Sequence, residues 1–354
     1  MLGIIKSYLF AFKYVISFAT KKVGSNSYSE ILEKYKGLDG NQVPMKIFYP
    51  KIKTKKTVII FLGASPDGEN HKAINLLAKI MAKSGYNVFV PRIPPLKKLD
   101  ISNKNVDWIA YIYDLIQSRE DVDSNYIIAL GISYGAGMLL KASLDKRIKK
   151  NPPKSIYLYG AGCNTETILR FITKGEFIVN NEVNKIKPHD WGLTVFFHHF
   201  IDDMGFGFNS KNIKEVIELR INNDKIEAQK KLEKLNSREF AIANSIISGK
   251  IIPEVQVIVD NILKNKSQYI KDLSCRSICG HITSKVFILH GANDSMIPYT
   301  ESIQINKLIP NSELLISYLF EHKGISTNRG VLFKLKEILR LIKFLSKFYR
   351  YNES

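Results

Sequence analysis

The chain has 354 residues, of which 45% are hydrophobic and 24% charged, and this ordinary balance excludes a chain that is disordered throughout. Its length fits one large domain or two smaller ones. The formal net charge of +19 favours anionic partners. However, the lysines are spread along the whole chain, and there is no nucleic-acid-binding motif. We therefore expect no nucleic-acid partner and attribute the excess charge to a generally basic composition.

Residues 1–22 form an apolar and basic segment that we expect to be helical. Lys6 and Lys13 interrupt its apolar run, whereas a membrane span needs about 18 uninterrupted apolar residues. A narrow lysine stripe beside a wide aromatic face is typical of a helix that lies on a membrane surface, here through residues 1–20. The alternatives are a helix packed on the domain and an export signal, because Ser17-Phe18-Ala19 loosely resembles a cleavage site. The localisation thus stays open between the cytoplasm, a membrane surface and export.

The first half of the chain alternates between strand and helix patterns. A hairpin is expected at its start, with turn residues Leu38-Asp39-Gly40-Asn41. Continuous apolar runs then indicate strands that are buried on both faces, and helical periodicity separates them. This pattern predicts a parallel sheet covered by helices. The expected strands are residues 31–35, 43–49, 57–62, 87–91, 126–130 and 155–159, and the expected helices are residues 70–83, 106–118 and 136–143.

The alternation breaks at residue 163 and resumes near residue 284. We expect residues 163–283 to form a mainly helical insertion, or cap, in which no segment has a clear strand pattern. Beyond it, residues 285–289 and 314–319 are expected strands, with a helix at 299–308 between them and a long basic helix at 330–349. The predicted core therefore comprises residues 28–162 and 284–350. The cap follows the sixth strand.

The run Gly131-Ile132-Ser133-Tyr134-Gly135 carries the clearest chemical signal. It lies between a predicted buried strand and a predicted helix, which is the context of a nucleophile on a sharp strand-to-helix turn. Side chains at the two glycines would collide with the strand and the helix. The alternative is a glycine-rich turn that binds phosphate at the helix start. We favour Ser133 as a nucleophile because two further signals agree with it.

Asp294 and His322 supply the other two parts of a catalytic triad. Asp294 lies just past a buried strand, in His290-Gly291-Ala292-Asn293-Asp294, where a carboxylate can orient a histidine. Taken alone, it would be read as a cap of the next helix or turn. His322 follows the last strand, where it can take the proton of a serine hydroxyl near neutral pH. His290 is instead expected to be packed at its strand end.

These motifs, in the order Ser133, Asp294, His322, resemble those of the α/β-hydrolase superfamily. The resemblance covers residues 28–349 apart from the insertion. It implies an eight-stranded, mostly parallel sheet flanked by helices, with Ser133 acylated by the substrate and deacylated by water. It implies no cofactor and no metal, and we interpret Cys163, Cys275 and Cys279 as ordinary thiols.

An oxyanion hole requires two N–H donors near the nucleophile. The backbone N–H of Tyr134 is the expected first donor. The second should come from the loop after residue 62, where Ala64 is preferred over Gly63 and Ser65. In the family this loop often begins with His-Gly, whereas here it begins with Leu62-Gly63. The choice among Gly63, Ala64 and Ser65 therefore stays open.

The sequence leaves the substrate open. We expect a serine hydrolase that cleaves a carboxylic ester of a small or lipid-like acyl group. A peptidase, a thioesterase or a lipase would use the same triad, and a ligand-binding protein could use the same fold. The insertion is expected to act as a lid. We interpret each individual residue of its apolar segment, residues 191–200, as part of the hydrophobic core of the insertion.

Overall fold

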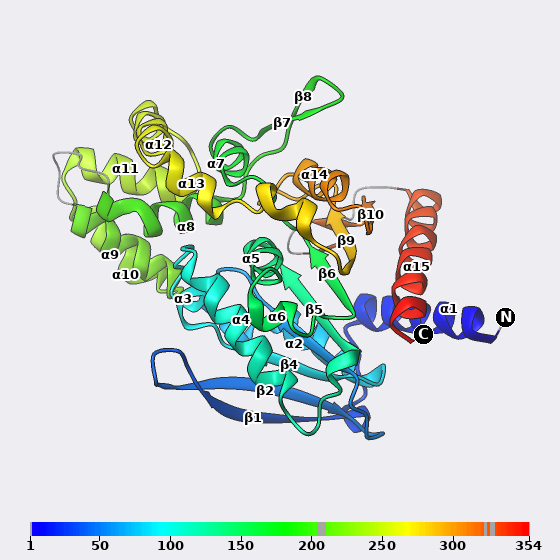
Figure 1. Cartoon of the computed structure of the whole chain (residues 1–354). Helices are drawn as coiled ribbons and strands as arrows, with labels where there is room; N and C mark the ends of the chain where they lie inside the picture. Colours follow the sequence, from blue (N-terminus) through cyan, green and yellow to red (C-terminus); the bar gives the residue numbers. More distant parts are fainter. Residues whose placement is uncertain (1, 204–209, 322–323, 326–329, 354) are drawn as a thin grey trace.

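The computed structural model describes residues 2–203, 210–321, 324–325 and 330–353 (Figure 1). Its main sheet has eight strands in the order β1-β2-β4-β3-β5-β6-β9-β10. The first three pair antiparallel and all later neighbours pair parallel, which confirms the expected mostly parallel sheet. The strands are β1 (Tyr28–Lys36), β2 (Gln42–Pro50), β3 (Thr57–Phe61), β4 (Asn87–Pro91), β5 (Ile127–Ile132), β6 (Ser155–Tyr159), β9 (Lys285–Gly291) and β10 (Ser312–Ser317).

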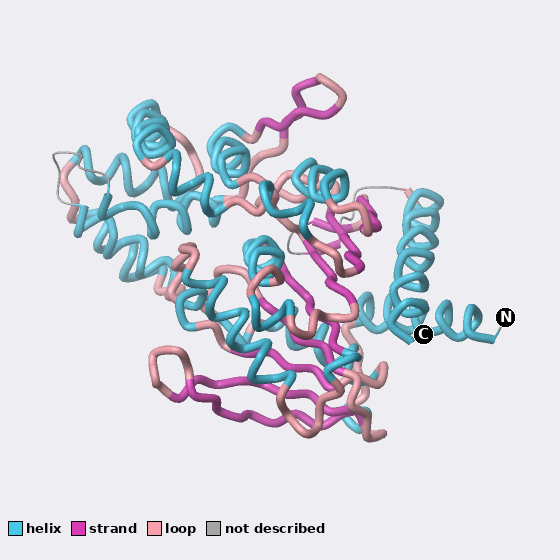
Figure 2. Tube along the Cα trace, viewed as in Figure 1, coloured by secondary structure: helices cyan, strands magenta, loops and turns pink. Residues whose placement is uncertain are grey.

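The central strands are buried because helices cover both faces of the sheet (Figure 2). Alternate residues of β3 enter different clusters: Ile59 and Phe61 pack with α4 and α5, and Val58 and Ile60 pack with α2 and α15. This three-layer arrangement explains the continuous apolar runs of the sequence. The helices of the core are α1 (Leu2–Thr20), α2 (Lys72–Lys83), α3 (Pro94–Lys97), α4 (Lys104–Gln117), α5 (Tyr134–Ala142), α6 (Lys146–Lys149), α14 (Thr300–Leu308) and α15 (Val331–Glu353).

Between β6 and β9 the chain forms a separate group of helices with its own apolar cluster. In Figure 1 this insertion lies on the side of the molecule away from α1 and α15. The segment at residues 191–200 supplies Leu193, Phe196, Phe197 and Phe200 to the cluster, so these side chains are core, as expected. The helices are α7 (Thr165–Lys174), α8 (Asp190–Phe200), α9 (Ser210–Ile221), α10 (Lys225–Glu233), α11 (Ser237–Ser248), α12 (Pro253–Asn265) and α13 (Ser267–Leu273).

The mainly helical insertion also contains two short strands that the sequence pattern did not reveal. β7 (Glu176–Val179) and β8 (Glu182–Lys185) form an antiparallel hairpin. Its two turn residues, Asn180 and Asn181, have φ values of 50° and 65°, and asparagine tolerates this left-handed region better than most residues. Each strand has only four residues, which is too short for an alternating pattern to stand out in the sequence.

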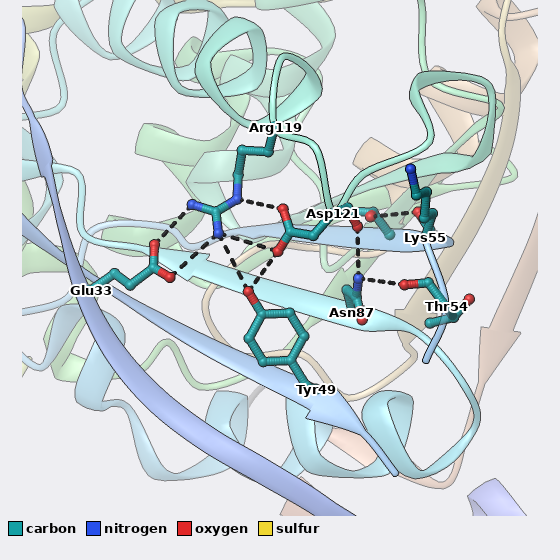
Figure 3. Close-up of polar contacts among 8 residues, drawn as sticks. Glu33, Tyr49, Thr54, Lys55, Asn87, Arg119 and Asp121 are labelled. Carbon is teal, nitrogen blue, oxygen red and sulfur yellow. Dashed lines mark hydrogen bonds and ion pairs between the residues drawn. The ribbon is translucent and has the colours of Figure 1, made fainter. Parts of the chain in front are cut away.

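A network of charged and polar side chains joins the loop before β5 to β1, β2 and β4 (Figure 3). Arg119 pairs with Glu33 and with Asp121, each at 2.8 Å, and the Tyr49 hydroxyl donates to Asp121 at 2.7 Å. The Asn87 amide donates to the Asp121 carbonyl at 2.9 Å. Burial raises the pKa of the Asp121 carboxyl, but the hydrogen bonds from Arg119 and Tyr49 outweigh it, and the net shift is downward. The network lies at the amino end of β5, so it holds the sheet at the edge opposite Ser133.

Candidate active site

Ser133 occupies a strained turn between β5 and α5. Its backbone has φ 55° and ψ −130°, a conformation that residues with a Cβ rarely adopt. The Ser133 N–H donates to the Tyr159 carbonyl at 2.8 Å, which fixes the turn against the end of β6. The sequence predicts a sharp turn here, and the hydrogen bond to Tyr159 shows how the fold holds this turn in place.

Three glycines allow the backbone to come this close. A Cβ at Gly135 would lie 2.2 Å from the Leu62 carbonyl oxygen, and one at Gly131 would lie 2.7 Å from the Ala136 Cα. Neither position leaves room for a side chain. A Cβ at Gly63 would lie 3.1 Å from the Ser133 Cβ, so the loop after β3 touches the nucleophile itself.

The same geometry bears on the oxyanion hole. The Ser65 N–H donates to the Leu96 carbonyl at 3.2 Å, so it is engaged away from the nucleophile. Gly63 lies against Ser133, and Ala64 follows it directly. Tyr134 is the first residue of α5, where backbone N–H groups point out of the helix start. Ala64 and Tyr134 therefore remain the predicted donors, and Ser65 no longer competes.

Asp294 lies in the loop after β9, at the carboxyl edge of the sheet where Ser133 follows β5. Its side chain is 1% exposed. Its Oδ1 accepts from the N–H groups of Met296 at 2.7 Å and Ile297 at 2.9 Å. These two bonds fix the orientation of the carboxylate, as the orienting member of a triad requires. They are also the turn-capping contacts that the alternative interpretation expects, so both roles are compatible with one side chain.

His290 is engaged inside the protein, as the sequence predicts. It is fully buried, its Nδ1 lies 2.6 Å from the Ser302 hydroxyl, and its Nε2 lies 3.0 Å from the Ile297 carbonyl oxygen. The Nε2 also lies 3.4 Å from Asp294 Oδ2. This histidine supports the Asp294 loop and is not placed to receive a proton from Ser133.

His322, the predicted base, lies outside the described residues. The flanking strands β11 (Phe320–Glu321) and β12 (Gly324–Ile325) pair antiparallel, with Glu321 opposite Gly324. β11 also lies beside β9, the strand that leads to Asp294. The structure therefore places Ser133, Tyr134 and Gly63-Ala64 together and Asp294 on the same edge, and the base stays a prediction.

The insertion reaches the predicted oxyanion hole. Ala64 and Tyr134 pack against its apolar cluster. The Tyr134 hydroxyl donates at 2.5 Å to the carbonyl of Ile101, a residue outside the insertion whose side chain packs into the same cluster. At the start of α8, the His189 N–H donates to the Ser295 carbonyl at 2.9 Å, next to Asp294. The insertion thus contacts both the oxyanion side and the acid side of the candidate site.

Sequence reasoning did not single out Glu301, which anchors the root of the insertion. This buried carboxylate accepts from the N–H groups of Cys163 at 3.0 Å and Asn164 at 2.7 Å, and from the Thr167 hydroxyl at 2.6 Å. Burial raises the pKa of Glu301. Its position on an expected helix gave no signal, because its partners are more than 130 residues away in the sequence.

The structure brings the three cysteines together, although Cys163 is far from the other two in sequence. The Sγ atoms of Cys163, Cys275 and Cys279 lie within 4.8 Å of one another, and all three are buried. Thiols attract soft metal ions, but these supply three ligands where a structural zinc site uses four. The cluster packs within the core between β6 and α5, and we keep the interpretation of ordinary thiols.

Comparison with known proteins finds similar folds among solved structures. No protein-family model and no curated protein matches the chain. The acylaminoacyl peptidase of Pyrococcus horikoshii matches with a TM-score of 0.53 and 16% identity, over 93% of this chain and 42% of the peptidase. A proposed hydrolase of Legionella pneumophila matches with a TM-score of 0.57 and 12% identity, over 96% of this chain and 95% of that one.

A puromycin-hydrolyzing peptidase of Mycobacterium tuberculosis matches with a TM-score of 0.51 and 12% identity, over 91% of this chain and 39% of the peptidase. This chain therefore spans about two fifths of the length of both peptidases. At such low identities the likeness establishes the fold and leaves the activity to the chemistry of the site.

Proposed function

We propose that this chain, which has the α/β-hydrolase fold, is a serine hydrolase that cleaves carboxylic esters. The observation that carries the proposal is Ser133, held in a strained turn between β5 and α5. A residue other than glycine at a positive φ costs folding free energy, of the order of 1–3 kcal/mol. The cost is understandable if the turn presents the hydroxyl to a substrate.

The proposed reaction begins when His322 takes the proton of the Ser133 hydroxyl as its oxygen attacks the ester carbonyl. The N–H groups of Tyr134 and Ala64 stabilise the oxyanion. The imidazolium then protonates the leaving alcohol, which leaves an acyl group on Ser133. In the second half, His322 takes a proton from water, the hydroxide attacks the acyl carbon, and the acid departs as Ser133 regains its proton. Asp294 orients the imidazole and stabilises its cation.

The proposed substrate is an ester with a small or lipid-like acyl group. Amide, thioester and lipid hydrolysis use the same groups, so a peptidase, a thioesterase or a lipase is the alternative within the same site. The insertion is the proposed lid over this site. Its contacts with Ala64 and with the Asp294 loop support this role. A panel of nitrophenyl esters of graded acyl length, together with matched amides and thioesters, separates these substrate classes.

The direct test of the activity compares Ser133→Ala with a matched control, Ser143→Ala. Ser143 lies at the end of the same helix, and its hydroxyl donates to the Leu140 carbonyl. Ser133→Ala should lower kcat/KM by roughly 10⁴-fold or more, since the nucleophile is gone. The control should keep its activity. Full ester hydrolysis by folded Ser133→Ala would refute the proposal.

A further inference from the structure

Helix α1 packs on the protein through one face, where the partly buried Phe10, Tyr14, Val15 and Phe18 lie against the core. Ser7, Ala11 and Ser17 are buried against the protein. The large apolar side chains on the outer side are 42% to 55% exposed: Ile4, Ile5, Tyr8, Leu9, Phe12 and Ile16. A surface helix of a globular protein normally presents polar side chains on its outer face, so this apolar outer face is fitted to an apolar environment outside the chain.

Helix α15 continues the same apolar surface. Leu332, Leu335 and Leu339 are 51% to 84% exposed. Leu335, Leu339 and Ile342 follow at spacings of four and three, which places them on one side of the helix. Ile342 joins the outer residues of α1 around an open apolar hollow of about 410 Å³. The α1/α15 surface, as we call these residues, is therefore continuous across two helices from opposite ends of the chain.

The charge around this surface is positive. Exposed lysines border it on both helices: Lys6 and Lys13 on α1, Lys336 and Lys343 on α15. The sequence of α1 holds no carboxylate, and the two on α15 are engaged elsewhere. Glu337 accepts from the Tyr318 N–H at 2.9 Å, and Glu353 pairs with Lys56 at 2.8 Å.

We propose that the α1/α15 surface docks on the face of an anionic phospholipid bilayer. The exposed apolar side chains would enter the headgroup boundary while the lysines meet lipid phosphates. Among the described residues, no single helix is long and apolar enough to span a bilayer, and only α11 with α12, bent by 75°, passes by length and composition as a pair. The α1/α15 surface therefore suits a helix pair that lies on the membrane.

Figure 1 shows α1 and α15 crossing at the side of the molecule away from the insertion. The stacked rings of Phe10 and Tyr349, 5.5 Å apart, join the two helices. Docking through this side would leave the insertion directed away from the bilayer. The proposal does not depend on the proposed hydrolase activity, and neither does its test.

The test is co-sedimentation of the full chain with vesicles of phosphatidylcholine alone or mixed with phosphatidylglycerol. Two double variants disrupt the surface: Leu9→Glu with Phe12→Glu on α1, and Leu335→Glu with Leu339→Glu on α15. We expect wild type to sediment with the anionic vesicles, less so at high salt. Each double variant should weaken this binding by about tenfold or more. Ile52→Glu, at a site that is 83% exposed outside this surface, is the matched control and should bind like wild type.

Circular dichroism and thermal unfolding confirm that each variant is folded. The proposal is overturned if wild type stays in the supernatant with both vesicle types, or if only one of the two double variants weakens binding. The other possible occupant of the surface is a second copy of the chain. Light scattering after size-exclusion chromatography measures the oligomeric state and so tests for this dimer. A dimer that becomes monomeric in both double variants, without vesicle binding by wild type, would assign the surface to self-association instead.

Discussion

At the scale of single residues, the backbone around Ser133 explains the glycines of the motif. Gly131 and Gly135 follow from the sequence, because they flank the serine directly. The sequence placed the loop of Gly63 near Ser133 only as a source of an oxyanion donor; the requirement for a glycine there was not predicted, because Gly63 lies 70 positions earlier and the pairing of β3 with β5 brings it against Ser133. A close approach between two loops leaves no periodic signal in either of them.

Gly63→Ala tests this contact. The new Cβ would lie 3.1 Å from the Ser133 Cβ and 3.1 Å from the Tyr134 nitrogen, so the nucleophile must shift by a few tenths of an ångström. We expect kcat for ester hydrolysis to fall by about tenfold, since small displacements of reacting groups are costly. Gly280→Ala is the control, because its Cβ meets nothing within 4 Å. Equal activity of the two variants would show that Gly63 does not position Ser133.

At the scale of elements, the sequence predicts the strands and helices of the core better than those of the insertion. The buried strands around β3 are recognised because both faces are covered, which gives continuous apolar runs. The β7–β8 hairpin is missed because its exposed residues, such as Ile178 and Val183, face away from any core. Its only signal was the Asn180-Asn181 pair. The candidate base is placed by sequence order alone, because His322 lies outside the described residues.

Glu301, on α14, should make the stability of the chain depend on pH. Burial raises its pKa above the ordinary value of 4.5. As the pH rises past that value, the unfolded chain releases the proton first, so unfolding becomes more favourable. The free energy of unfolding of wild type relative to Glu301→Gln should therefore fall with rising pH, by at most about 1.4 kcal/mol per pH unit, until the folded group ionises too.

Chemical denaturation of both proteins across a pH series measures this difference. Glu301→Gln is the suitable reference because it keeps the size of the side chain and cannot ionise. A constant difference would mean that the hydrogen bonds from Cys163, Asn164 and Thr167 balance the burial, and one that rises with pH would mean that they outweigh it.

At the scale of the whole molecule, the carboxyl edge and the amino edge of the sheet, where the parallel strands end and begin, have different roles. The carboxyl edge carries Ser133 and Asp294, whereas the amino edge carries the network of Arg119, Asp121 and Glu33. The motifs in the sequence predict the two residues at the carboxyl edge, Ser133 and Asp294. The sequence does not predict the network, because its partners come from four separate elements and have no characteristic spacing.

Arg119→Met should separate stability from activity. The change removes the ion pairs with Glu33 and Asp121, which are partly exposed, and should lower the free energy of unfolding by about 1–3 kcal/mol. Below the unfolding temperature, kcat/KM should stay at the wild-type value. A large fall in kcat/KM of the folded variant would show that the amino edge also shapes the site.

The nucleophilic role of Ser133 is tested most directly by the mass of the protein after reaction with a fluorophosphonate, which modifies activated serines. The account predicts a single adduct on the peptide that contains Ser133, and no adduct on Ser133→Ala. Asp294→Asn should react more slowly at the same serine, since the base loses its orienting partner. An unmodified wild type, or an adduct on another residue, would contradict the assignment of Ser133 as the nucleophile.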